Sequence, residues 1–256
     1  MTGLNNRFGR LATLLERIRE PEPPPPGNLS DVIYTLLVLL VAMILIGAVV
    51  GAVLSNNDPS PTSLLLGWTV GGLIATFIIG AAHRRTPEKW TALRLSSLPD
   101  TRLRNVLLVS LSATILLDLS SAILTGQFLP APEVLRFTSV SVDVGSWFLA
   151  ALFLVIVQPV AEELVFRGVT LPRLRMRLGL WSGLVVTAAL YALFHALVYD
   201  VSGIDHPGLL WYVLAVPFIA GLIMGLVRLG TGSTRAAILA HLSFGLFALL
   251  KSYLLL

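Results

Sequence analysis

The sequence predicts an all-α protein, a polytopic bundle of about seven transmembrane helices. Hydrophobic residues make up 55% of its 256 residues and charged residues only 12%, about half the charged share of soluble domains. The charges cluster between long apolar runs, and about 18 apolar residues suffice to cross a bilayer. To within a few residues, the predicted spans are 31–54, 63–82, 106–127, 146–167, 182–200, 209–227 and 236–255.

Three parts follow from this division: a basic, proline-rich segment at 1–30, N-terminal transmembrane helices at 31–144, and a C-terminal region at 145–256 whose spans carry most of the membrane-buried polar residues. The first part lacks the apolar core of a signal peptide. Its residues 4–19 are expected either to lie on the membrane surface as a short basic amphipathic helix or to form a flexible tail.

The positive charges predict the orientation, because cytoplasmic loops are enriched in lysine and arginine. Sixteen of the eighteen fall on the side of the N-terminus, and only Arg136 and Lys251 fall on the other. We therefore expect a cytoplasmic N-terminus and a C-terminus outside. Anionic lipid accounts for the basic surplus, so no nucleic-acid partner is needed. The chain has no cysteine, which excludes disulfides and thiol catalysis.

Two carboxylates and an arginine interrupt the fourth span, in PVAEELVFRGV at 159–169. Buried charges in a bilayer are costly and usually point into the bundle. Glu163 and Arg167 are four residues apart on one helix face, so an ion pair is predicted. Glu162 lies about 100° around the helix from that face, and Gln158, one turn earlier, is placed to hydrogen-bond it. Glu162 is therefore the candidate base.

Two histidines occupy later apolar spans, His195 in the fifth and His241 in the seventh, whereas His83 and His206 fall at predicted span ends. The fourth and fifth spans are expected to turn over near Gly179.

Glu163 and His195 are each sixteen residues from that turn, so they should lie at one level, about 24 Å from it. This places the candidate site within the membrane, nearer its cytoplasmic side. Asp118 in the third span either faces this site or packs against Ser120 and Ser121.

Three short motifs give the C-terminal region a family resemblance. EELVFR at 162–167 matches the EExxxR signature of the CPBP intramembrane proteases, which include CAAX prenyl endopeptidases and bacteriocin-processing Abi proteins. YALFH at 191–195 is similar to the second motif, usually Phe-x-x-x-His, with Tyr191 in the aromatic place. AILAHLSFG at 237–245 resembles the third, His-x-x-x-Asn. The resemblance covers about 145–250, which makes 145–256 a CPBP-like catalytic region.

The resemblance implies hydrolysis of peptide bonds inside the membrane. Glu162 would activate water with help from His195, His241 would stabilise the oxyanion, and Glu163 and Arg167 would orient these groups, with Gln158 and Tyr191 beside them. Glu162, His195 and His241 are also suitable ligands for Zn²⁺. A metal-free mechanism fits equally well, because a buried carboxylate is a stronger base. A multi-pass protein of the bacterial inner membrane is implied.

The implied substrate is a membrane-embedded or lipidated polypeptide: a prenylated CAAX peptide, a bacteriocin leader or a segment of a membrane protein. HExxH, GxSG and GxGD sites of other intramembrane proteases are absent.

One departure from the family pattern is Gly245, which stands where asparagine is usual. We expect an asparagine at this position to fit without a clash and to add a donor to the site. The departure leaves a noncatalytic scaffold or immunity protein of the same fold as the main alternative. A proton-coupled transporter with a Glu162–His195 relay is a third hypothesis, which the lack of an internal repeat weakens.

Overall fold

The computed structural model describes residues 12–13, 15–54, 60–95, 100–128, 144–199, 208 and 210–255, and within these ranges every regular element is a helix. Seven helices are long and apolar enough to cross a membrane, as predicted. Their bounds are Leu29–Leu54, Thr62–Arg84, Leu103–Thr125, Val144–Leu178, Leu180–Val198, Trp211–Thr231 and Thr234–Leu254.

The first three spans come from the N-terminal half of the chain. The first is built from α2 (Leu29–Val41), η1 (Ala42–Ile46) and α3 (Gly47–Leu54), where η marks a π-helical stretch. The second is α4 (Pro61–Arg84), which begins after Ser60, whose side chain accepts a hydrogen bond from the Ser63 N–H and so caps the helix. The short helix α5 (Pro87–Ala92) follows, and α6 (Asp100–Thr125) is the third span.

The fourth span is one long helix assembled from α8 (Val144–Ala151), η2 (Leu152–Val157), α9 (Gln158–Glu163), η3 (Leu164–Thr170) and α10 (Leu171–Leu178). The fifth is α11 (Leu180–Val198), the sixth η4 (Trp211–Ala215) with α12 (Val216–Thr231), and the seventh α13 (Thr234–Leu254). Gly179, between α10 and α11, has a φ of 84°, which only glycine adopts readily, and it makes the predicted turn between the fourth and fifth spans.

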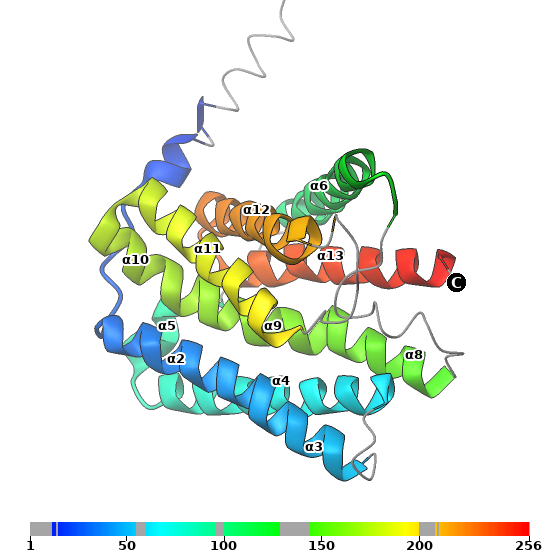
Figure 1. Cartoon of the computed structure of the whole chain (residues 1–256). Helices are drawn as coiled ribbons and strands as arrows, with labels where there is room; N and C mark the ends of the chain where they lie inside the picture. The colour runs from blue at the N-terminus through cyan, green and yellow to red at the C-terminus, as the bar shows by residue number, and fades with distance from the viewer. Residues whose placement is uncertain are drawn as a thin grey trace, which may run out of the picture.

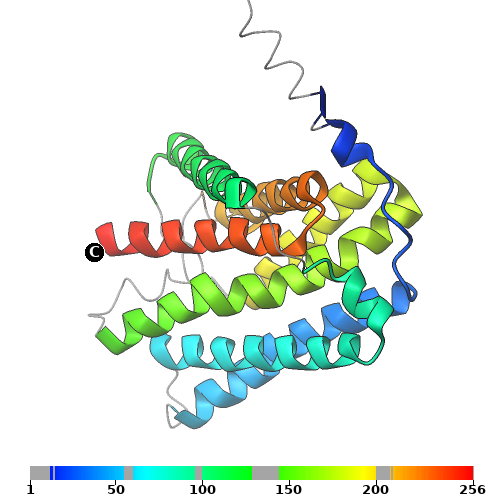
Figure 2. The ribbon, with the colours of Figure 1, turned by 180° about the vertical axis from the view of Figure 1, so that it is seen from behind.

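The fourth span is the central helix of the bundle. In both views α2, α3 and α4 lie on one side of it and α6, α12 and α13 on the other (Figures 1 and 2). All seven residues of η3 are buried, whereas outward-facing side chains such as Phe77 and Ile123 are 76% and 83% exposed within the protein and suit contact with lipid. Because the fourth span is surrounded by other helices, its charged side chains can be paired inside the protein and kept away from lipid.

The fourth span is longer than the sequence analysis predicted, and its expected end at 167 was wrong. The helix has 35 residues, about 52 Å at 1.5 Å per residue, against about 30 Å for the hydrocarbon core. Its last turns carry Arg173 and Arg175, which lie beyond the predicted end of the span. Both arginines are partly or fully buried because they donate to the N-terminal segment: Arg173 to the Pro26 carbonyl and Arg175 to the Ile18 and Glu20 carbonyls.

Of the range 4–19, the structure describes residues 12–13 and 15–19; these are helical, as one of the two expected forms has it, and all but Ile18 are exposed, while contact of this helix with the membrane surface stays a prediction. Ile18 is buried in a cluster with Leu171, Leu184 and Leu229. Residues 4–11 and 14 lie outside the described ranges.

An ion pair fixes the same segment further along. The Glu22 carboxylate accepts hydrogen bonds of 2.6 and 3.1 Å from Arg228. Burial alone would raise the pKa of Glu22, but the hydrogen bond and charge of Arg228, with the charges of Arg94 and Arg175, hold it below its ordinary value. Asp31 likewise pairs with Arg173 and Lys89. The arginine-rich ends of the helices thus meet at one end of the bundle; the side of the membrane that this end faces stays a prediction.

Close helix contacts depend on glycine. A Cβ at Gly67 or Gly71 would overlap backbone atoms of Gly47 or Ala42, so these two glycines let α4 lie against the first span. A Cβ at Gly245 would overlap the Leu154 carbonyl oxygen. The expectation that asparagine fits at 245 was therefore wrong, because the backbone of η2 occupies the space beside this residue.

We predict that Gly245→Ala destabilises the protein by about 1–3 kcal/mol, the usual cost of overpacking, although alanine is intrinsically better in a helix by about 1 kcal/mol. The measurement is the melting temperature in detergent. Gly80→Ala is the matched control, since a Cβ there meets nothing within 4 Å, and it should melt at or above the wild-type temperature. If both variants melt alike, the close contact at Leu154 is contradicted.

Candidate intramembrane active site

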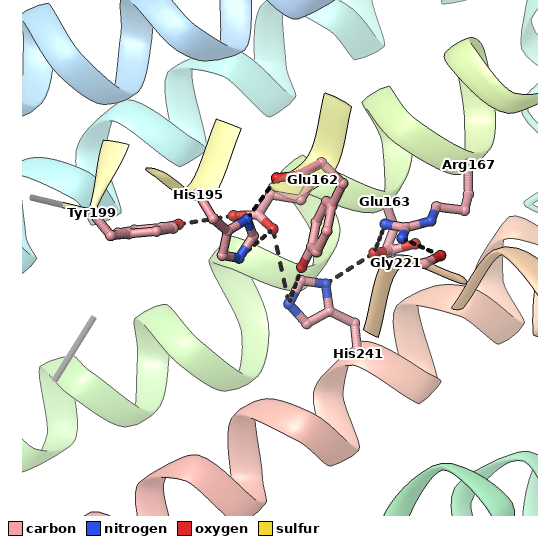
Figure 3. Close-up of polar contacts among 8 residues, drawn as sticks. Glu162, Glu163, Arg167, His195, Tyr199, Gly221 and His241 are labelled. Carbon is pink, nitrogen blue, oxygen red and sulfur yellow. Dashed lines mark hydrogen bonds and ion pairs between the residues drawn. The ribbon is translucent and has the colours of Figure 1, made fainter. Parts of the chain in front are cut away.

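The polar residues singled out in the sequence come together inside the bundle from three spans (Figure 3). The fourth span supplies the two carboxylates and the arginine, α11 supplies a tyrosine and a histidine, and α13 supplies the second histidine. The group consists of Glu162, Glu163, Arg167, Tyr191, His195 and His241, and all six are at least nine-tenths buried. Glu163 and His195 were predicted to lie at one level of the bundle, and the 3.8 Å distance between His195 Nε2 and the neighbouring Glu162 agrees with that prediction.

The helix that carries the carboxylates has an irregular backbone on both sides of them. The six α-helical residues of α9 stand between the π-helical stretches η2 and η3. Pro159 lacks the N–H that would continue the helical hydrogen bonding, and π-helical insertions are often found at functional sites. The two π-helical stretches thus flank the place where Glu162 and Glu163 point in different directions inside the protein.

Glu162 faces both histidines. One carboxylate oxygen, Oε1, accepts a 2.8 Å hydrogen bond from the Tyr199 hydroxyl. The other, Oε2, lies 3.8 Å from His195 Nε2 and 4.0 Å from His241 Nε2. Sequence reasoning missed Tyr199, although its spacing of four residues from His195 was an available signal. The tyrosine fixes the carboxylate so that Oε2 is directed at the histidine rings.

The hydrogen bonds at Nδ1 fix which nitrogen of each histidine faces Glu162. His195 Nδ1 lies 3.1 Å from the Tyr191 carbonyl oxygen, and His241 Nδ1 lies 3.0 Å from Glu163 Oε1. A carbonyl and a carboxylate oxygen only accept hydrogen bonds, so each Nδ1 carries the proton. In the neutral rings both Nε2 atoms are therefore acceptors, and they converge with Glu162 Oε2 on one region.

Glu163 and Arg167 form the ion pair that their spacing predicted. Arg167 Nη1 donates to Glu163 Oε1 over 2.6 Å, and both side chains are completely buried. Arg167 Nη2 also donates to the Gly221 carbonyl oxygen on α12, at 2.9 Å, and the guanidinium carbon lies 4.5 Å from the centre of the Tyr191 ring. Glu163 thus joins the arginine to His241 and holds that ring in place.

A cavity runs from the histidines along the bundle. At one end it is lined by Gln158, Tyr191, His195 and His241, and much of the remaining wall is apolar side chains of α6, α12 and α13. The Tyr191 hydroxyl lies 3.4 Å from His241 Nε2. The predicted hydrogen bond between Gln158 and Glu162 stays a prediction.

Other polar residues from the sequence analysis have different positions. Asp118 lines the cavity, as one of the two alternatives expected, but its partner is Lys251 on α13 and not the serines beside it. Lys251 had been counted with Arg136 on the side opposite the N-terminus; Arg136 and His206 lie outside the described residues. His83 is buried at the end of α4, where Nδ1 lies 2.9 Å from the Ile79 carbonyl oxygen, and does not join the site.

The donor set of Glu162, His195 and His241 is chemically suited to zinc, but its spacing is wide. Ligand distances of 2.0–2.1 Å in a tetrahedral site separate ligand atoms by about 3.4 Å, against 3.8 and 4.0 Å here. Among the described residues, no group of three His, Asp or Glu side chains meets the geometry of a metal site. The reaction steps described below therefore use side chains of the protein alone.

Residues 144–247 match the family model of the type II CAAX prenyl endopeptidases, described as Rce1-like. Over this stretch the chain is similar to the CAAX prenyl endopeptidases. The match covers the fourth, fifth and sixth transmembrane helices, part of the seventh and all three motifs, and it confirms the resemblance to the CAAX proteases. Comparisons with curated proteins and with solved structures gave no match. A CAAX protease-like activity is thereby supported at the level of the family.

We predict that Glu163→Gln lowers the stability by about 3–5 kcal/mol, because it leaves the Arg167 charge buried without its partner. The measurement is thermal melting in detergent. Lys89→Gln is the matched control: it breaks a pair whose side chains are 31% and 22% exposed, and such a pair contributes about 0–1 kcal/mol. An unchanged melting temperature for Glu163→Gln would contradict the structural role of the pair.

Proposed function

We propose that this protein is an intramembrane endopeptidase that uses Glu162 to activate water against a peptide bond of a lipidated or membrane-embedded substrate. One observation carries the proposal: Glu162 Oε2 lies within 4.0 Å of Nε2 of both His195 and His241 inside the bundle. The match to CAAX prenyl endopeptidases supports a prenylated peptide as the substrate class.

The attacking water is oriented by two acceptors. A water between Glu162 Oε2 and His195 Nε2 can donate one proton to each, since hydrogen bonds of about 2.8 Å to both span a gap of this size. One lone pair of the water then points away from both groups, toward the substrate carbonyl. As the new C–O bond forms, Glu162 takes the proton, and it gives that proton to the departing amine when the C–N bond breaks.

The negative charge on the carbonyl oxygen needs donors in a dry site. His241 supplies one such donor when it is protonated. Its Nδ1–H then still donates to Glu163, and its Nε2–H is directed into the cavity. Tyr191 supplies a second: its hydroxyl is 3.4 Å from His241 Nε2, and both residues line the cavity.

Tyr191 also replaces a missing group. The family's asparagine is Gly245 here, and the Leu154 carbonyl excludes any side chain from that position. The family's second motif usually has phenylalanine where this chain has Tyr191. We propose that the phenol O–H takes over the donor role of the absent asparagine.

Glu162→Gln should lower the cleavage rate by a factor of about 100 or more, because the amide keeps the shape of the side chain but cannot take a proton. The assay is cleavage of a farnesylated-cysteine peptide extended by three aliphatic residues, with the purified protein in lipid vesicles. Glu88→Gln, at an exposed glutamate of α5, is the control and should cleave at the wild-type rate.

A Glu162→Gln variant that folds normally and keeps more than half of the rate would contradict the mechanism. Proteomics of native membranes that contain the wild type or the variant would show whether any membrane protein is cleaved. If the wild type cleaves neither such a protein nor this peptide, the noncatalytic scaffold is favoured.

Tyr191→Phe should lower kcat by a factor of about 100, the scale seen when one oxyanion donor is removed, with little change in KM or melting temperature. Tyr253→Phe is the matched control: the same atom is removed from a side chain that is 66% exposed, and the rate should not change. If Tyr191→Phe cleaves as fast as the wild type, Tyr191 has only a packing role.

A further inference from the structure

A second polar junction lies at the arginine-rich end of the bundle, and its centre is Arg228 near the end of α12. The side chain of Arg228 is 1% exposed. Its two Nη atoms donate to the two oxygens of the Glu22 carboxylate, at 2.6 and 3.1 Å, and its Nε donates to the Thr234 hydroxyl at 3.1 Å. All three guanidinium nitrogens are thus bonded, to the N-terminal segment on one side and to the first residue of α13 on the other.

The N-terminal strap, residues 18–26, connects this junction to the fourth span. Arg175 of α10 donates to two carbonyl oxygens of the strap, those of Ile18 and Glu20. The strap passes along α10 on its way to α2 (Figure 1). Glu22 follows these two carbonyls directly, so it joins the end of the fourth span to Arg228. The outer junction therefore ties together the fourth, sixth and seventh spans.

The active site contains an inner junction of the same three spans, two helical turns away. Its contacts on the sixth and seventh spans are the Gly221 carbonyl, which accepts from Arg167, and the His241 ring, which donates to Glu163. Arg228 follows Gly221 by seven residues on α12, and Thr234 precedes His241 by seven on α13. Seven residues make almost two full turns, so the members of each pair share a helix face about 10 Å apart.

The face of α12 that packs on α11 is rich in glycine. A Cβ at Gly225 would lie 2.3 Å from Leu184 Cδ1, and a Cβ at Gly221 would lie 3.1 Å from Ala188 Cα. At these positions α12 has no side chain that interlocks with its neighbour. Trp211 holds the other end of the sixth span, but to α6 and not to the fourth span. The axial position of α12 therefore depends more on its polar contacts.

We propose that Arg228, held by Glu22 of the N-terminal strap, is a positioning residue for the active site. It sets the axial positions of α12 and α13, and through them those of the Gly221 carbonyl and the His241 ring. The catalytic consequence rests on the proposed peptidase function: a misplacement of about 1 Å can lower a rate by a factor of about 100. The strap lies outside residues 144–247, which match the family model, so it is a support that this chain adds to the matched region.

Three variants test the junction. Glu22→Gln keeps the length of the side chain and removes the charge that holds Arg228. Glu20→Gln is the matched control on the same strap, because the side chain is exposed and the backbone carbonyl that accepts from Arg175 is kept. Thr234→Val removes the bond from Arg228 to α13 and leaves every charge paired, so it tests the junction even if Glu22→Gln does not fold.

The first readout is cleavage of the farnesylated-cysteine peptide, measured below the melting temperature of each variant. Glu22→Gln should lower kcat by a factor of about 10 or more with little change in KM, because a misplaced His241 weakens an interaction made in the transition state. Thr234→Val should act in the same direction, and Glu20→Gln should cleave at the wild-type rate. Equal kcat values for Glu22→Gln and Glu20→Gln overturn the proposal.

The second readout needs no turnover and therefore separates this inference from the proposed function. In ¹⁵N-histidine-labelled protein, the Nδ1–H resonance of His241 is assigned by its loss in His241→Gln. This resonance should shift or broaden in Glu22→Gln and Thr234→Val and stay in place in Glu20→Gln. A shift in a protein that cleaves nothing supports the positioning role and contradicts only the peptidase function. If folded Glu22→Gln and Thr234→Val melt at lower temperatures but keep the wild-type resonance, the junction only stabilises the protein and the proposal is overturned.

Discussion

The ion pair between Glu163 and Arg167 holds the interior of this bundle together. Each charge alone would cost about 2.5–3.5 kcal/mol in the middle of a membrane, and here both are completely buried at 2.6 Å from one another. The same Glu163 oxygen accepts from His241, and the arginine continues to the Gly221 carbonyl. One salt bridge therefore connects the fourth, sixth and seventh spans. The orientation of His241, and with it the convergence of both imidazoles on Glu162, depends on this connection.

This constraint explains why the polar groups are divided into two sets. Glu163 and Arg167 pair with each other, and Arg167 also donates to the Gly221 carbonyl, so their charges are used in holding the helices. Glu162, on an adjacent face of the same helix, is held by Tyr199 and directed at the histidines. Adjacent glutamates thus have different surroundings because one helical step turns them about 100° apart. The π-helical stretches on both sides of α9 lie where this division occurs.

Much of this arrangement could be predicted from the sequence because it is local. Apolar runs identify the seven spans, the four-residue spacing identifies the Glu163–Arg167 pair, and equal distances from Gly179 place Glu163 and His195 at one level. Contacts between distant segments leave no such periodic signal. The Asp118–Lys251 pair joins residues 133 positions apart, and the contact of Gly245 with Leu154 depends on how closely two backbones approach.

The length of the fourth helix was misjudged for a related reason. Arg173 and Arg175 lie beyond the apolar run that marks the span in the sequence, and they are tolerated in the helix because carbonyl groups of the distant N-terminal segment accept hydrogen bonds from them.

The central claim is that a water held by Glu162 attacks the peptide bond directly, and single-turnover cleavage in H₂¹⁸O measures this attack. With enzyme in excess over the farnesylated peptide, direct attack should place one ¹⁸O atom in the new carboxylate of every product molecule, as detected by mass spectrometry. Product that carries only ¹⁶O after one turnover would contradict the account, because the oxygen would then have come from an enzyme carboxylate through a covalent intermediate.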